Sequence, residues 1–163
     1  MSERFTVRVT KDYLVFCSGH FITYEGSECE RLHGHNYRVA VEVTGPLDTN
    51  RYVFDFIALK NIMRQLTDEL DHRMLIATES KLIRFEQRDQ EVHLQFKNKR
   101  WMFPLEDCCL LPIENTTAEL LARYLAQRLL DVFREKGWPL PHHVRMDVEE
   151  SFGQVAQYDL NLM

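Results

Sequence analysis

The sequence predicts an α+β fold in which two helices pack on one face of an antiparallel sheet. Three observations support this prediction: strand patterns lie at both ends of the chain, two helical patterns lie between them, and short turns connect neighbouring strands. The 163 residues suffice for a single domain, 1–163, with its own core. Because the helices cover only one face of the sheet, we expect the other face to meet a partner in an oligomer.

The predicted strands alternate in polarity or are continuously apolar. They are RFTVRV, YLVFCSGHFI, NYRVAVEV, HVRMDVEES and VAQYDLNL. The third of these is followed by GPLDTN, which contains the residues that tight turns need.

Two helices are predicted from apolar residues at helical spacing. Asp55 is a suitable N-cap for the first, FIALKNIMRQLTDEL. The second follows ENTT, with Thr116 or Thr117 as its cap, and ends near Gly137.

An insert of about residues 80–112 separates the two helices. Within it Val92, Leu94 and Phe96 alternate, and KNK provides a turn before the next apolar residues. The segment KLIRFEQRDQEVHLQFKNKRWMF is therefore predicted to form a β meander, which places a β-hairpin insert between the two helices.

Composition excludes several kinds of partner. The formal net charge is −5 and no basic stripe is visible, so we expect no nucleic-acid partner. No apolar run approaches the ~20 residues of a membrane span, and the first residues lack the apolar segment of a signal peptide. A cytoplasmic protein is the expectation, with its four cysteines present as thiols.

Two of the cysteines have different surroundings. Cys17 lies in an apolar run and is predicted to be a small buried hydrophobe. Cys29 has Glu28, Glu30 and Arg31 as neighbours, so we do not expect it to fill the core.

The segment CERLHGHNY places a thiol, a carboxylate and two imidazoles within seven positions. His33 and His35 are two apart, so a strand directs both side chains to one face, and Gly34 allows close approach of backbone or ligand. Two such imidazoles are half of a zinc site, although histidines in a polar loop are also common.

A catalytic zinc ion takes three protein ligands and leaves a fourth position open. His20 is the candidate third ligand, because its strand can pair with the one that starts at His33. The alternative is a histidine whose hydrogen bonds are satisfied inside the core.

Two acidic residues, Asp71 and Glu150, are also candidates for a functional role. Asp71 in LDH can orient His72 as a tuned acid or base, or His72 is simply a favourable cation near a helix C-terminus. Glu150 continues the apolar face of Val144, Met146 and Val148, where a ligand with paired N–H donors would satisfy its carboxylate. The alternative is that the strand has already left the core there.

Together these segments resemble a known family. His20, CERLHGHNY, LDH, ENTTAELLARYL and VEES occur in the order seen in the 6-pyruvoyl-tetrahydropterin synthase and 6-carboxy-tetrahydropterin synthase family. The resemblance covers nearly the whole chain apart from the insert. It implies the tunnelling fold, whose four-stranded antiparallel sheets join around a barrel in trimers or hexamers, with active sites between subunits.

The resemblance also implies a set of site residues. Zinc would be held by His20, His33 and His35. Glu150 would anchor the pterin ring through its 2-amino and N3 groups. Thr117 falls where the family contacts pterin across a subunit boundary.

The implied catalytic group is Cys29, as general base or acid, with Asp71 and His72 as its partner relay. Zinc would make C–H protons of the substrate side chain more acidic, and a thiolate whose pKa is lowered by nearby cations would remove one.

One feature departs from the family pattern. Members with C-x-x-x-H-G-H usually make 6-carboxy-tetrahydropterin for deazapurines of the queuosine type, whereas a branch with E-x-x-H-G-H cleaves dihydroneopterin side chains toward folate. Here Cys29 and Glu30 are adjacent, so both patterns are present.

The sequence therefore predicts a zinc-dependent lyase that converts 7,8-dihydroneopterin triphosphate to 6-carboxy-5,6,7,8-tetrahydropterin. The alternatives are a 6-pyruvoyl-tetrahydropterin product, side-chain cleavage through Glu30, or a non-catalytic pterin-binding module.

Overall fold

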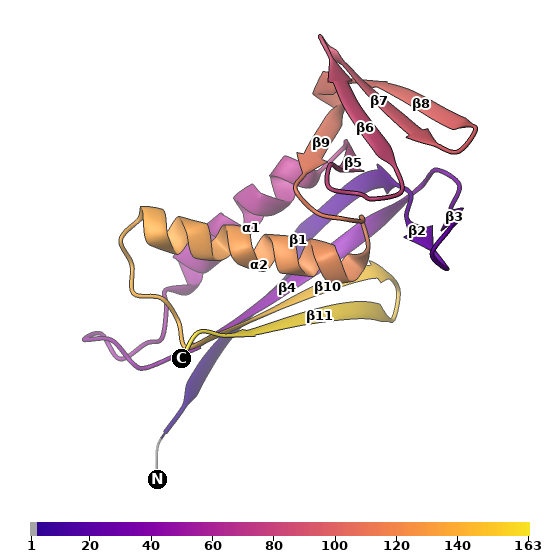
Figure 1. The fold of residues 1–163 in the computed structure, drawn as a ribbon. Helices are drawn as coiled ribbons and strands as arrows, with labels where there is room; N and C mark the ends of the chain where they lie inside the picture. The colour runs from indigo at the N-terminus through magenta and orange to yellow at the C-terminus, as the bar shows by residue number, and fades with distance from the viewer. Residues whose placement is uncertain (1–2) are drawn as a thin grey trace.

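The computed structural model describes residues 3–163 and shows two helices lying across one face of a long, twisted sheet (Figure 1). The elements in chain order are β1 (Phe5–His20), β2 (Thr23–Tyr24), β3 (Glu28–Cys29), β4 (His33–Gly45), α1 (Phe56–Leu70), β5 (Arg73–Ala77), β6 (Arg84–Arg88), β7 (Glu91–Phe96), β8 (Lys99–Pro104), the 3₁₀ turn η1 (Leu105–Asp107), β9 (Cys108–Leu111), α2 (Ala118–Glu135), β10 (His143–Ser151) and β11 (Gln154–Asn161).

The main sheet has six strands in the order β11-β10-β4-β1-β5-β9. Four of them, β11 to β1, are antiparallel, as predicted, while β5 and β9 extend the sheet as short parallel strands. The predicted count of four was therefore wrong. Both added strands are short apolar runs without alternation, and such a run cannot be distinguished from a buried helical segment by its pattern.

The first two predicted strands form the single strand β1. Its pairing with β4 is interrupted between Thr10 and Val15, where the register shifts, and resumes to His20. An extra stretch of this kind bends a strand without ending it. Beyond the irregularity Phe16, Ser18 and His20 point inward, so Cys17 is exposed. The prediction that Cys17 is buried was wrong because the alternation places Ser18 inside instead.

The insert is a separate three-stranded antiparallel sheet, β6-β7-β8, which agrees with the predicted meander and has one strand more than a hairpin. Its first strand, β6, has the mostly charged sequence RFEQR, so its own pattern marks a strand only weakly. The end of the predicted insert is β9, which returns to the main sheet.

The helix boundaries follow the predicted capping residues. Asp55 caps α1, its side chain accepting a hydrogen bond from Ala58 N. Thr117, rather than Thr116, caps α2 by accepting one from Leu120 N. No helix in the described part of the chain has both the length and the apolar character needed to cross a membrane.

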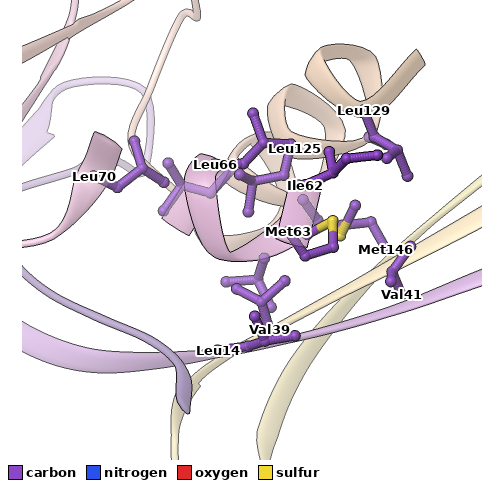
Figure 2. Close-up of a cluster of buried hydrophobic side chains, with 14 of the residues drawn as sticks. Leu14, Val39, Val41, Ile62, Met63, Leu66, Leu70, Leu125, Leu129 and Met146 are labelled. Atoms are coloured by element: carbon purple, nitrogen blue, oxygen red, sulfur yellow. The ribbon is translucent and has the colours of Figure 1, made fainter. Parts of the chain in front are cut away.

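Two hydrophobic clusters stabilise the molecule. The main core lies between the helices and the sheet, where Met63 and Leu66 of α1 and Leu125 of α2 face Val39 and other strand residues (Figure 2). A smaller insert cluster lies beneath β6–β8. Its buried members are Phe21, Cys29, Ile76, Ile83, Val92, Leu94, Phe96 and Cys108.

Candidate metal centre and active site

Three histidines converge where β1 ends and β4 begins. His20 and His33 are direct partners across the two antiparallel strands, and His35 lies opposite Ser18. One ring nitrogen from each histidine lies within 4.8 Å of the others. The strand pairing predicted for His20 is thus present. It brings together three imidazoles, the first and last of which are 15 residues apart in the sequence.

Gly34 permits this pairing. A Cβ atom at Gly34 would lie 3.0 Å from the carbonyl oxygen of Ser18, which is backbone and cannot easily move. The glycine therefore lets β1 and β4 approach closely at the level of the histidines, as the sequence suggested.

Each of the three histidines has its Nδ1 atom occupied by a neighbouring oxygen. The contacts are His20 Nδ1 to the Thr116 carbonyl at 2.9 Å, His33 Nδ1 to the Arg31 carbonyl at 2.8 Å, and His35 Nδ1 to Ser151 Oγ at 3.4 Å. Partners of this kind set the tautomer and the orientation of metal-binding histidines. The Nε2 atoms are thus the candidate metal ligands, with the Tyr37 hydroxyl 3.1 Å from that of His20, and the donor set fits a divalent metal ion with an open position.

Two carboxylates face these Nε2 atoms. Glu150 Oε1 lies 3.5 Å from His20 Nε2 and 3.7 Å from His35 Nε2, while Glu30 Oε2 lies 3.9 Å from His33 Nε2. Neither glutamate has left the site for solvent. Glu150 exposes 28% of its side chain and lies at a register irregularity of β10, with its carboxylate turned toward the histidines.

Burial controls the titration of the innermost groups. It is the main cause that lowers the pKa of His20 to about 4; the charges of His33 and His35 act in the same direction, and the Thr116 carbonyl acts in the opposite direction. Burial, followed by the charge of Glu150, raises the pKa of Tyr37, whose hydroxyl lies 3.1 Å from His20 Nε2. The His20 ring is therefore neutral at pH 7, the form that binds a metal ion.

Cys29 lies close to the histidines in sequence but belongs to the insert cluster, where only 7% of its surface is exposed. Its Sγ donates to the Glu30 carbonyl at 3.5 Å, and Lys99 Nζ donates to the Cys29 carbonyl at 3.0 Å. Burial raises the pKa of the Cys29 thiol, and Lys99 offsets this only in part. Both expectations for Cys29 were therefore wrong: it does fill a core, and desolvation outweighs the nearby cation.

Asp71 and His72 form the predicted pair at the end of α1. Asp71 Oδ2 lies 2.8 Å from His72 Nδ1, and Asp71 Oδ1 accepts a bond from Cys17 N at 2.7 Å. Burial raises the pKa of Asp71, but the bonds from Cys17 and His72 more than compensate and leave it below its usual value. His72 adopts a left-handed backbone conformation, with φ of 56°, and exposes 82% of its side chain.

Within the described residues of one chain, no hydrogen bond or ion pair joins this pair to Cys29 or to the three histidines. Within a single subunit, the predicted catalytic residues are therefore not linked to one another by such bonds.

Thr117 and Glu150 line one cleft of about 380 Å³ between the start of α2 and the β10–β11 hairpin. Ile22, Ala118 and Val155 add apolar surface to it. The two residues predicted to bind substrate are thus brought to the same opening, although their sequence positions are far apart.

Sequence reasoning missed the residues that hold the histidines. Thr116 was considered only as a helix cap, yet it is 1% exposed, and its hydroxyl donates to the Phe21 carbonyl at 3.2 Å. Arg31 acts through its carbonyl, which no side-chain pattern reveals. Ser151 follows Glu150 directly and was visible only as part of VEES.

The comparison with known proteins agrees with this geometry. The sequence profile described as 6-pyruvoyl tetrahydropterin synthase matches residues 8–161. The chain belongs to this family. A relative from Methanocaldococcus jannaschii, a putative 6-carboxy-5,6,7,8-tetrahydropterin synthase, is 34% identical over 146 residues, which are 89% of this chain and 89% of that protein.

Solved structures of the 6-pyruvoyl tetrahydropterin synthase family share the fold. The synthase from Plasmodium vivax matches with a TM-score of 0.88 and 26% identity, over 99% of this chain and 100% of that one. Two further structures of the Plasmodium vivax protein are variants of a catalytic residue, a glutamate replaced by alanine or by cysteine. A dihydroneopterin monophosphate aldolase from Pyrococcus furiosus is 40% identical over 60 residues, 37% of this chain and 50% of that protein.

Proposed function

We propose that this protein is a zinc-dependent lyase that converts 7,8-dihydroneopterin triphosphate to 6-carboxy-5,6,7,8-tetrahydropterin. The observation that carries the proposal is the convergence of one ring nitrogen from each of three histidines beside a carboxylate-lined cleft, in a chain of the 6-pyruvoyl tetrahydropterin synthase family. The name of the Methanocaldococcus jannaschii relative supports the choice of product.

Binding of the pterin ring is assigned to Glu150 and Thr117. The carboxylate of Glu150 can accept two parallel N–H bonds from the guanidine-like edge of a pterin, which gives both affinity and orientation. Thr117 lines the same cleft at the start of α2. Ring capture at Glu150 would direct the pterin side chain toward the histidines, because Glu150 Oε1 lies within 3.7 Å of two of them.

The metal would be held by His20, His33 and His35. The chemistry that zinc supplies there is Lewis acidity, which polarises side-chain oxygens and makes neighbouring C–H protons more acidic. The Thr116, Arg31 and Ser151 oxygens keep the three imidazoles oriented.

Proton transfer is assigned to Cys29, with the Asp71–His72 pair acting from a second copy of the chain. The uncovered face of the sheet and the separation of this pair from Cys29 within one chain support a trimer or hexamer with sites between subunits. Asp71, held by Cys17 N, would keep the His72 imidazole in the orientation and tautomer that returns a proton.

A second candidate function is cleavage of the dihydroneopterin side chain with Glu30 as the base. The observation that favours it is that the Glu30 carboxylate faces His33 at 3.9 Å, whereas Cys29 is buried in the insert cluster. The catalytic glutamate of the Plasmodium vivax synthase and the aldolase from Pyrococcus furiosus support this candidate.

The deciding experiment is incubation of the metal-analysed protein with 7,8-dihydroneopterin triphosphate, followed by mass spectrometry of the pterins formed. We expect about one zinc per chain and a 6-carboxy product. A 6-pyruvoyl or 6-hydroxymethyl product would replace the proposed reaction with another on the same site. Zinc binding and pterin binding without conversion would identify a non-catalytic pterin-binding module.

Two matched variants separate the candidate bases. Cys29→Ala is expected to keep zinc and lose the 6-carboxy product, and Glu30→Gln is expected to keep both. Loss of turnover in Glu30→Gln with full activity in Cys29→Ala would transfer the proton-transfer role to Glu30.

A further inference from the structure

The insert sheet has two chemically different faces. Its inner face carries Leu94, Phe96 and Trp101, which pack into the insert cluster, and Trp101 stacks on Phe21 with ring centroids 4.4 Å apart. Side chains alternate along each strand, so the neighbouring positions point outward. These outward residues are Arg84, Glu86, Arg88, Glu91, His93, Gln95, Arg100 and Met102.

Three arginines surround a hollow of about 450 Å³ on this outer face. The strand register places Arg84, Gln95 and Arg100 in one cross-strand row. Because Gln95 lies on the strand between them, the two arginine backbones are two strand spacings, or roughly 10 Å, apart. Long guanidinium side chains on this row can therefore reach a ligand that spans more than one charged group.

The acidic residues of this face pair with some of its basic residues but do not neutralise the whole positive charge. Glu86 Oε2 lies 2.8 Å from Arg88 and 3.8 Å from Arg84, and Glu91 pairs with His93 at 2.9 Å. Arg100 forms no ion pair with any residue that the structure describes. Three guanidinium groups and one carboxylate, that of Glu86, thus line the hollow, in a protein whose formal net charge is −5.

We propose that this hollow binds the phosphate groups of a polyphosphate-bearing ligand. The planar guanidinium fork of arginine matches two phosphate oxygens and stays charged at every physiological pH. The spacing of Arg84 and Arg100 favours a chain of two or three phosphates over a single orthophosphate. The site lies on the face of the insert opposite Phe21, so it is separate from the histidine centre and does not depend on the function proposed for it.

The test is isothermal titration calorimetry of the full-length, metal-loaded protein with inorganic triphosphate, orthophosphate and ATP. We expect saturable binding of triphosphate that weakens as salt is added, and much weaker binding of orthophosphate. Equal affinity for ATP would mean that the phosphates alone are recognised. Affinity for ATP at least about tenfold higher would mean that a nucleotide is the preferred source of the same phosphates.

Variants localise the binding. Arg84→Ala and Arg100→Ala, both at exposed positions, should each weaken triphosphate binding by about tenfold, as the loss of a charged hydrogen-bonding partner implies. Glu86→Gln should strengthen it by removing a negative charge. Arg134→Ala, an exposed arginine near the end of α2, is the matched control and should bind as the wild type does.

A last variant separates this site from the metal centre. His33→Ala should bind triphosphate unchanged, even if it has lost its metal. Wild-type affinity in Arg84→Ala and Arg100→Ala, or loss of binding in His33→Ala, would overturn the proposal.

Discussion

The main core and the insert cluster bury similar side chains but have different consequences for the active site. The main core joins both helices to the sheet by packed hydrophobic side chains (Figure 2), and it includes Tyr37, whose hydroxyl contacts His20. The insert cluster also buries Cys29, a residue proposed for chemistry, and raises its pKa. His20 lies between the two, directly before Phe21 of the insert cluster. Hydrophobic burial therefore stabilises the main core, and in the insert cluster it also sets the reactivity of the Cys29 thiol.

The largest expected effect comes from removing a histidine that neither cluster encloses. His33 exposes 39% of its side chain, so His33→Ala should leave the fold intact while metal content falls from about one per chain to near zero. Turnover should fall on the order of a thousandfold, since metal Lewis acidity contributes several kcal/mol to the transition state. Metal analysis, circular dichroism and product assays test this, and a variant that retains metal would exclude His33 as a ligand.

The second effect concerns stability and compares the two clusters directly. Leu125 is fully buried between α2 and the sheet, so Leu125→Ala should lower the free energy of unfolding by about 3 kcal/mol. Leu94→Ala in the insert cluster should lower it less, because β6–β8 can open locally without unfolding the main sheet. Urea denaturation of both variants measures the difference, and equal losses would show that the two clusters unfold as one unit.

The same Leu94→Ala variant should change the reactivity of Cys29. Loosening the insert cluster exposes the thiol and removes the desolvation that raises its pKa, so its reaction with a disulfide reagent should accelerate about tenfold. The assay needs a Cys17→Ser, Cys108→Ala, Cys109→Ala background, because Cys17 is exposed, Cys108 belongs to the same insert cluster and Cys109 is half-buried; only backbone atoms of Cys17 bind Asp71 and His72. Leu125→Ala is the matched control. If the thiol reacts equally faster in that variant, the insert cluster does not specifically control the reactivity of Cys29.

A smaller effect is expected from the residues that orient the histidines. Ser151→Ala removes the hydroxyl that lies 3.4 Å from His35 Nδ1. Loss of such a partner typically weakens metal binding about 10- to 100-fold, and this long contact should fall at the lower end. Competition with a chelator measures the change, and unaltered affinity would show that the hydroxyl does not orient His35.

The smallest effect lies on the open face of the sheet, far from both clusters. The bond from Arg145, together with a bond from His143, lowers the pKa of Asp159 although burial acts in the opposite direction. A carboxyl whose pKa is lower in the folded protein stabilises the fold at pH values above its pKa in the unfolded chain. This contribution to stability is lost as the pH falls through the pKa of the folded state. Asp159→Asn should therefore be slightly less stable than the wild type at pH 7, and the difference should shrink below about pH 4. Thermal melts at several pH values test this, and a difference that grows in acid would have the wrong sign.

Local patterns were sufficient for the features that depend on neighbouring residues in the chain. Asp55 was recognised as a helix cap and the alternation around Val148 was recognised as an inward face, because capping and strand parity are properties of a few consecutive residues. The spacing of His33 and His35 indicated a metal site for the same reason. The third ligand, His20, followed once the two strands were assumed to pair.

The sequence by itself thus determined the α+β class, the two helices, the histidine set and the family to which the chain is similar. Only the tertiary structure decided the parallel strands β5 and β9, the exposure of Cys17 and the burial of Cys29. Each of these depends on contacts between segments far apart in the chain, such as Lys99 with the Cys29 carbonyl. Such contacts are set by the packing of whole elements against one another, and no short stretch of sequence records them.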